Sequence, residues 1–149
     1  MGKAKDGSRQ SGCPVAYGLD VFGDRWTLVI IRDMLMVGKR YYGEFLECPE
    51  RIASNVLADR LKKLEDAEIV SKAIDPSNQS KIIYKLTPKG VDLIPMVLEV
   101  ILWGNKHAPQ TNTPPELLRK IKKDRAGTIR EIVDCLKNNE SFVAKNKWV

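Results

Sequence analysis

A segment patterned as a helix runs directly into two segments patterned as strands, and this succession constrains the fold more than any other feature. In SNVLADRLKKLEDAEIV, residues 54–70, Leu57, Leu61 and Leu64 fall on one face of a helix. The segments IVSKAI and KIIYKL that follow are rich in β-branched residues, and DPSNQS between them is rich in turn formers. We therefore expect an amphipathic helix followed by a β-hairpin, whose exposed side carries Lys72, Lys81 and Lys85.

Three shorter helical patterns precede this segment. CPVAYGLDVFGD has a proline where a first helical turn accepts one, and Gly23 ends it. In RWTLVIIRDMLMV apolar residues surround most of the helix, so we expect a buried helix capped by Asp24 and ended by Gly38. A third, YYGEFLEC, is brief. These helices can support the leucine face of residues 54–70.

An apolar helix is expected after the hairpin. Thr87 and Pro88 supply an N-cap and a first-turn proline for KGVDLIPMVLEVILWGNKHA, which is apolar on nearly every side. A monomer of this size cannot easily bury such a helix all round, so its surplus face predicts a partner subunit. Pro95 is expected to kink the helix or to break one backbone hydrogen bond.

Two spacings near the C-terminus predict a short and a longer helix. Thr113 with Glu116, and Thr128 with Glu131, each match a capping box. The longer helix has one apolar stripe, which must dock on the main domain or on a second chain.

Composition narrows the class of protein. The excess of 25 Lys and Arg over 19 Asp and Glu gives a net charge of +6, which favours a polyanionic partner without identifying one. The sequence contains no apolar run of the roughly 18 residues that a bilayer span requires, and its N-terminus lacks the apolar core of a secretory signal. We therefore expect a cytoplasmic protein. One histidine and three widely spaced cysteines predict no metal site, no cofactor and no disulfide framework.

The order helix, buried helix, short helix, amphipathic helix, hairpin, long helix is that of a mainly α winged helix-turn-helix fold with a small β-hairpin wing. A helix in the major groove must pack its apolar face while exposing hydrogen-bonding side chains, and a wing can reach an adjacent groove or the backbone with lysines. The expected organisation is a disordered basic tail at 1–12, a DNA-binding and dimerisation domain at 13–108, a linker at 109–115, a C-terminal helical extension at 116–139 and a tail at 140–149.

The exposed side of residues 54–70 supplies candidate contacts to double-stranded DNA. Asn55 is suited to an adenine edge, Lys62 to a guanine edge or a phosphate, and Ser54 to a phosphate near the helix N-terminus. Asp59 opposes a polyanion unless it accepts from a cytosine amine or holds a neighbouring cation. Arg60 lies beside the leucine face and fits either a phosphate contact or an internal pair with Glu44 or Glu65.

Other readings of the same residues stay open. A charged outer helix face is often simply solvated, and lysines on a hairpin also block aggregation between sheet edges. The chain then fits a winged-helix protein-interaction module with only non-specific DNA affinity. An enzyme would need Cys13 or Cys48 as nucleophile and His107 as base, but no phosphate loop or paired-carboxylate spacing accompanies them. We therefore expect no catalysis.

Four motifs resemble a known family. CPVAYGLDVFGDRWTLVIIRDML, YYGEF, VLADRLKKLEDAEIV and YKLTPKG, in this order, resemble the HxlR-type winged helix-turn-helix transcriptional regulators, a MarR-like family. The resemblance covers about Cys13 to Trp103. It implies a homodimer on a pseudo-palindromic operator, with the first helix and the long C-terminal helix forming the dimer interface, and it implies no catalysis.

The resemblance also implies where DNA is contacted. Two positions depart from the family pattern: Ala53 stands where a serine commonly caps the recognition helix, so Ser54 must cap it or the first turn is weaker, and Glu68 stands where glycine is common. If the backbone of Glu68 has a positive φ, the strain costs about 1 kcal/mol. By position, the implied DNA contacts are Arg40, Tyr41, Tyr42, Ser54, Asn55, Asp59, Arg60, Lys62, Lys63, Lys72 and Lys81.

Cys13 is the candidate for redox sensing. It precedes Pro14 at an expected helix N-terminus, where the helix dipole favours a thiolate. Some members of the family that the chain resembles sense oxidants or electrophiles with a cysteine here, although a buried or merely capping thiol is the alternative; Cys48 and Cys135 are expected to be inert. A small-molecule or oxidant effector is thus a candidate partner, with Tyr17, Trp26 and Trp103 as candidate pocket lining.

Overall fold

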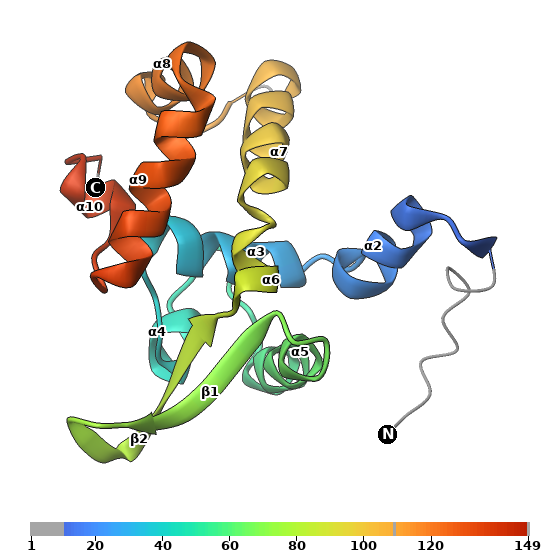
Figure 1. The fold of residues 1–149 in the computed structure, drawn as a ribbon, viewed down its shortest axis with the longest axis vertical. Helices are drawn as coiled ribbons and strands as arrows, with labels where there is room; N and C mark the ends of the chain where they lie inside the picture. Colours follow the sequence, from blue (N-terminus) through green and yellow to red (C-terminus); the bar gives the residue numbers. More distant parts are fainter. Residues whose placement is uncertain (1–10, 109, 149) are drawn as a thin grey trace.

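The computed structural model describes residues 11–108 and 110–148, and its elements follow the expected order (Figure 1). The expected 1–12 tail lies mostly outside this range. The mainly helical fold with a two-stranded wing is confirmed. The elements are α2 (Pro14–Phe22), α3 (Thr27–Arg32), the π-helix η1 (Asp33–Val37), α4 (Tyr42–Leu46), α5 (Ser54–Asp66), β1 (Val70–Asp75), β2 (Asn78–Leu86), α6 (Pro88–Val91), α7 (Ile94–His107), α8 (Pro115–Lys123), α9 (Arg125–Lys137) and α10 (Phe142–Lys145).

The helix expected from residue 25 onward is buried and is capped by Asp24, as predicted. The Asp24 carboxylate accepts hydrogen bonds from the backbone N–H of Trp26 at 2.8 Å and of Thr27 at 3.0 Å, so two free donors of the first turn are satisfied. The helix runs from α3 into η1 and ends at Gly38, whose φ of +79° is the left-handed conformation that glycine adopts at little cost. Ile31 and Leu35 on this helix are fully buried in the core.

The hairpin has the expected antiparallel pairing, but its lysines do not share one side. Lys72 pairs with Tyr84 and Ser71 pairs with Lys85. Directly paired residues share a face and consecutive residues alternate, so Lys72 lies on the face opposite to Lys85. Lys81 lies four residues before Lys85, on the same face. The expectation of one lysine-bearing side is therefore wrong, and the wing presents cations on two faces.

The long apolar helix is broken, as Pro95 predicted. Helix α6 ends at Val91 and α7 begins at Ile94. The break lies here because the backbone nitrogen of Pro95 has no hydrogen to donate to the preceding turn. On α7, Ile94 and Leu98 are buried, whereas the side chain of Trp103 is 68% exposed. One face of α7 thus packs on the core and another is left uncovered.

Helix α2 has no buried residue and projects away from the rest of the chain (Figure 1). Its apolar Val15 and Leu19 are 68% and 56% exposed. Nothing in the described part of this single chain covers them.

The C-terminal helices dock on the main domain, where Ile132 and Cys135 of α9 are buried. Residues 140–148 are not the expected tail: Phe142 of α10 is fully buried against η1 and the core, with its ring 5.3 Å from that of Trp148. Burial of the large Phe142 side chain holds residues 140–148 against the domain, although most residues of this segment are polar.

Neither predicted capping box forms. Pro114 stands at the N-cap of α8, and Asp124 caps α9 by accepting from Gly127 N at 2.9 Å. Thr128 lies inside α9 and is buried, and its hydroxyl donates to the backbone oxygen of Asp124 and lies within hydrogen-bond distance of that of Lys120 in α8. An aspartate four residues earlier therefore replaced threonine as the cap. In the described ranges, no helix is both long and apolar enough to cross a membrane.

Candidate nucleic-acid interface

Helix α5 is anchored on one face and open on the other. Leu57, Leu61 and Leu64 are at most 2% exposed, so the leucine face is fully packed. The opposite face, which carries Asn55, Asp59, Lys62 and Lys63, is exposed. Helices α8 to α10 lie at the other end of the molecule and do not cover it (Figure 1).

The start of α5 is held by α4 rather than by a cap of its own. Ala53 is the N-cap and gives no side-chain hydrogen bond, and Ser54 is the first helical residue, so the expected Ser54 cap is not formed. The Tyr42 hydroxyl instead donates to the Ser54 carbonyl oxygen at 2.6 Å and lies 2.6 Å from its Oγ. Tyr42 therefore fixes the position of the N-terminus of α5 relative to α4.

The cations of α5 are paired with carboxylates. Arg60 donates from Nε to Asp24 Oδ1 at 2.9 Å and also pairs with Asp59. The expected pairing of Arg60 with Glu44 or Glu65 is therefore wrong. Asp59 also lies 3.3 Å from Lys63 Nζ. Asp59 thus holds neighbouring cations, which was one of its two expected roles. Lys62 pairs with Asp66 at 2.7 Å, and this exposed pair contributes little stability.

The Asp24 carboxylate joins two parts of the domain. Its partial burial works against ionisation, but hydrogen bonds from Thr27, Arg60 and the backbone of the first turn prevail and lower the pKa of Asp24 to about 2. The same group caps α3 and holds Arg60 of α5. Asp24 therefore sets the angle between α3 and α5.

A second cluster of cations lies where α4 meets the wing. The Tyr41 hydroxyl donates to Asp75 Oδ2 at 2.5 Å, which together with hydrogen bonds from Ser77 lowers the pKa of Asp75 to about 2. Arg40 and Lys81 lie over the Tyr41 ring, at 5.6 and 5.1 Å from its centroid. The Arg40–Tyr41–Lys81 cluster thus places two positive charges beside the wing.

The remaining wing residues are less free than expected. Lys72 lies 3.8 Å from Glu65 of α5. Glu68, which precedes the wing, has a φ of +61°, so the strain expected for a non-glycine residue at this position is present. Its carbonyl oxygen accepts a hydrogen bond from the Thr87 hydroxyl at 2.6 Å, which holds the strained turn in place.

The three cysteines differ in access. Cys13 is exposed and occupies the N-cap of α2, whereas Cys48 and Cys135 are buried. Burial raises the pKa of the Cys135 thiol. Of the three thiols, only that of Cys13 is open to a reagent in solution.

The arrangement of an exposed recognition helix beside a basic wing agrees with the comparison to known proteins. The model of the HxlR-like helix-turn-helix family matches residues 21–112. The chain belongs to this family. It is a winged helix-turn-helix transcriptional regulator, and solved structures of similar regulators share its fold.

Individual relatives support this assignment. The chain is 34% identical to the HTH-type transcriptional regulator YodB of Bacillus subtilis over 102 residues, 68% of this chain and 90% of YodB. It is 31% identical to the HTH-type transcriptional regulator Rv3095 of Mycobacterium tuberculosis over 93% of this chain and 85% of Rv3095, a match that extends into the C-terminal helices.

Two solved structures of similar regulators show an oxidised form and a quinone-bound form. The redox regulator HypR in its oxidised form superimposes with a TM-score of 0.58 at 30% identity, covering 66% of this chain and 100% of HypR. The quinone-bound form of YodB superimposes with a TM-score of 0.52 at 30% identity, covering 63% of this chain and 98% of YodB.

Sequence reasoning missed the residues that position this HxlR-family interface. Asp24 is visible in the sequence as a helix cap but not as the partner of Arg60, which lies 36 residues away. Asp75 opens the DPSNQS turn, and only the fold shows that Tyr41 reaches it. The sequence signal in both cases is an aspartate at an element boundary, which is too common to identify a partner.

Proposed function

We propose that this regulator is a homodimer that binds a pseudo-palindromic operator sequence-specifically through α5 and the wing. The observation that carries the proposal is the contrast between the two faces of α5, one fully packed by three leucines and the other open. A helix held this firmly can enter a major groove without losing its own packing.

Two copies are proposed because α2 and α7 leave apolar surface uncovered. Val15, Leu19 and Trp103 are all more than half exposed. Single exposed apolar residues are common, but a nine-residue helix without a buried residue is marginal by itself and gains stability when a partner covers it. A second copy supplies the same surface by two-fold symmetry and presents a second α5 to the DNA.

The residues of the proposed DNA interface have three kinds of role. Asn55 and Lys62 face base edges, and Ser54 and Lys63 face phosphates near the same groove. Asp59 and Arg60 hold the helix and its neighbouring cations, because Arg60 pairs with both Asp24 and Asp59, and Asp59 also lies beside Lys63. Phosphates beside the groove are met by Arg40, Tyr41, Tyr42, Lys72 and Lys81.

Cys13 is the proposed sensor of oxidants or electrophiles. It is the exposed thiol of the three, and relatives include a redox regulator and a quinone-bound regulator. Addition of the thiolate sulfur to a quinone ring carbon forms a C–S bond, and the ring takes up a proton to become a hydroquinone. The adduct then lies at the N-terminus of α2, the helix proposed to form part of the dimer contact. No catalytic turnover is proposed.

Reaction with a maleimide near neutral pH tests the sensor. Cys13 is expected to react faster than Cys48 or Cys135, and modification is expected to weaken DNA binding. A Cys13→Ser chain should keep its DNA affinity and lose this response. Equal rates at the three thiols with unchanged DNA affinity would end the proposal for Cys13.

Selection of bound duplexes from random DNA, followed by a salt titration of the best one, tests the function. A palindromic consensus and a steep loss of affinity with salt are expected, because cations released from the phosphates drive binding. No enriched sequence, with weak affinity for all duplexes, would instead support the protein-interaction module.

A further inference from the structure

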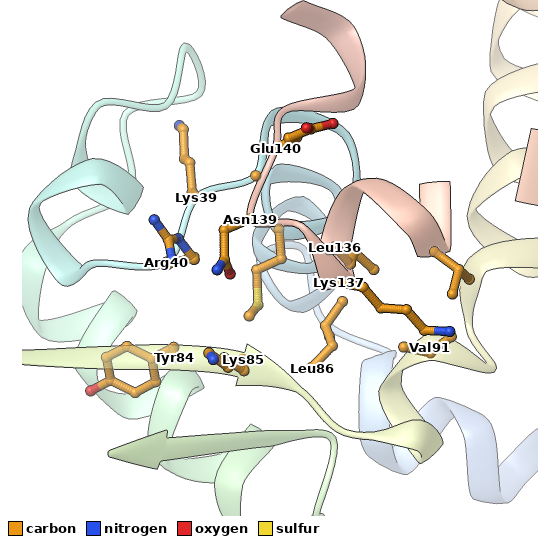
Figure 2. A pocket seen from close by; sticks show the side chains of 13 residues that line it. Lys39, Arg40, Tyr84, Lys85, Leu86, Val91, Leu136, Lys137, Asn139 and Glu140 are labelled. Carbon is orange, nitrogen blue, oxygen red and sulfur yellow. The ribbon is translucent and has the colours of Figure 1, made fainter. Parts of the chain in front are cut away.

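A pocket of about 260 Å³ opens between the loop after η1, strand β2 and the end of α9 (Figure 2). Its apolar lining includes Met34 of η1, Leu86 of β2, Val91 of α6, and Val133 and Leu136 of α9. None of the aromatic residues suggested by the sequence, Tyr17, Trp26 and Trp103, lines it. The volume and the apolar lining suit a molecule of one or two rings.

Positive charge surrounds this apolar surface. Arg40, Lys85 and Lys137 line the pocket from three different elements, and Figure 2 shows their side chains around it. Within the described ranges, the structure gives no ion pair to a carboxylate for Lys85 or Lys137, whereas Arg40 lies near enough to Asp75 to help lower the pKa of that carboxyl. The acidic lining residue, Glu140, lies 3.8 Å from Lys145 outside the pocket. The charge at the pocket is therefore complementary to an anion.

The pocket walls are fixed by short contacts. Lys39 pairs with the buried Asp33 at 2.8 Å, and the backbone oxygen of Arg40 accepts from Tyr84 N at 2.8 Å. A Cβ at Gly38 would lie 3.0 Å from the Glu140 carbonyl oxygen, so this loop touches the C-terminal extension. A site whose walls are already in place loses little conformational freedom when it binds.

We propose that this pocket binds a small aromatic carboxylate. The ring lies on Met34, Leu86, Val133 and Leu136, and the carboxylate accepts hydrogen bonds from Arg40, Lys85 or Lys137. Charge-assisted hydrogen bonds at the mouth of an apolar pocket select the carboxylate over an uncharged analogue. This site is separate from Cys13 and depends on α9, which lies beyond the residues that the family model matches.

One consequence rests on the proposed function. Arg40 lines the pocket and also belongs to the Arg40–Tyr41–Lys81 cluster proposed to meet a DNA phosphate. A bound carboxylate competes with that phosphate for the guanidinium. The ligand is therefore expected to weaken operator binding.

Calorimetry of the full chain without DNA tests the site, with 2-naphthoate and its uncharged analogue 2-naphthamide as probes. We expect saturable binding of one naphthoate per chain, with the amide about tenfold weaker. Lys137→Met and Lys85→Met are expected to weaken naphthoate by about fivefold each, since each removes one cation. Lys123→Met, an exposed lysine on α8 away from the pocket, should bind as the wild type does.

Val133→Trp fills the pocket and is expected to abolish binding, with circular dichroism confirming that the variant folds. No saturable naphthoate binding, equal binding of the amide, or an equal loss in Lys123→Met would overturn the proposal. Because DNA is absent, a failure here is distinct from a failure of the proposed function. With the selected duplex added, naphthoate should lower DNA affinity in the wild type, by less in Lys137→Met at the same concentration, and not at all in Val133→Trp.

Discussion

Helices α5 and α2 carry the same kind of apolar pattern, but the single chain covers only one of them. Leu57, Leu61 and Leu64 of α5 are buried by the domain itself, whereas α2 has no buried residue. Apolar residues at helical spacing thus predict that one face of the helix is covered, but they do not predict whether the same domain or another chain covers it. For α5 it is the domain core, and for α2 we propose the second chain.

The largest expected effect separates these two kinds of partner. Leu61→Ala is expected to lower the free energy of unfolding by about 2–5 kcal/mol at every protein concentration, because it leaves a cavity in the core. Leu19→Ala on α2 should lower stability only at concentrations at which the dimer forms. Urea unfolding at two concentrations a hundredfold apart measures both. A loss in Leu19→Ala that is independent of concentration would place α2 on its own domain.

The next prediction concerns the uncovered face of α7. Trp103→Asp is expected to raise the dimer dissociation constant about 100-fold, because an exposed tryptophan at an interface is a common hot spot. Sedimentation equilibrium measures the constant, with Lys122→Asp on α8 as control. If both variants dimerise like the wild type, the uncovered face of α7 has another purpose.

The open face of α5 is tested by Asn55→Ala. Loss of a bidentate base contact is expected to cost about 1–3 kcal/mol on the selected sequence and to relax its preference at one base pair. Lys81→Ala on the wing should instead weaken all duplexes alike and reduce the salt slope by about 1. Fluorescence anisotropy with consensus and scrambled duplexes distinguishes the two. A uniform loss in Asn55→Ala contradicts base reading by this residue.

A smaller effect concerns the Asp24 contact that holds α5 in place. Because the pKa of Asp24 is lowered from 3.8 to about 2, its contribution is present above pH 3.8 and is lost as the pH falls toward 2. Asp75 titrates in the same range, so Asp24→Asn should reduce the acid loss without removing it. Urea midpoints between pH 5 and 2 measure this. Parallel curves for the two chains would show that Asp24 does not contribute.

The smallest expected change is at the strained turn before the wing. Glu68→Gly relieves a φ of +61° and is expected to raise the free energy of unfolding by up to about 1 kcal/mol, partly offset by the freedom of glycine in the unfolded chain. Urea unfolding measures it, with Glu47→Gly in an ordinary backbone conformation as the control, which should destabilise.

The order of elements was predictable because each depends on neighbours in the sequence. The leucine spacing of α5, the proline break before α7 and the Asp24 cap are all local. The two predicted capping boxes are absent because Pro114 is the N-cap of α8 and Asp124 is the N-cap of α9. The segment predicted as a C-terminal tail is ordered because Phe142 is buried in the core. These outcomes depend on residues that become neighbours only after folding.

The same division applies to the candidate site. The exposed face of α5 follows from the burial of its leucines, and the sequence predicts it. The pairing of Arg60 with Asp24 and the division of the wing lysines between two faces do not follow, because they require the packing angle and the strand register. The pocket against α9 is equally invisible, since its walls come from three distant segments.

Hydroxyl-radical footprinting of the wild-type chain on its selected duplex tests the central claim most directly. If α2 and α7 pair two chains and each α5 enters a major groove, two protected segments are expected with centres about one helical turn apart, roughly 10 base pairs. A single protected segment, or uniform protection along the duplex, would contradict a dimer that reads DNA with the open face of α5.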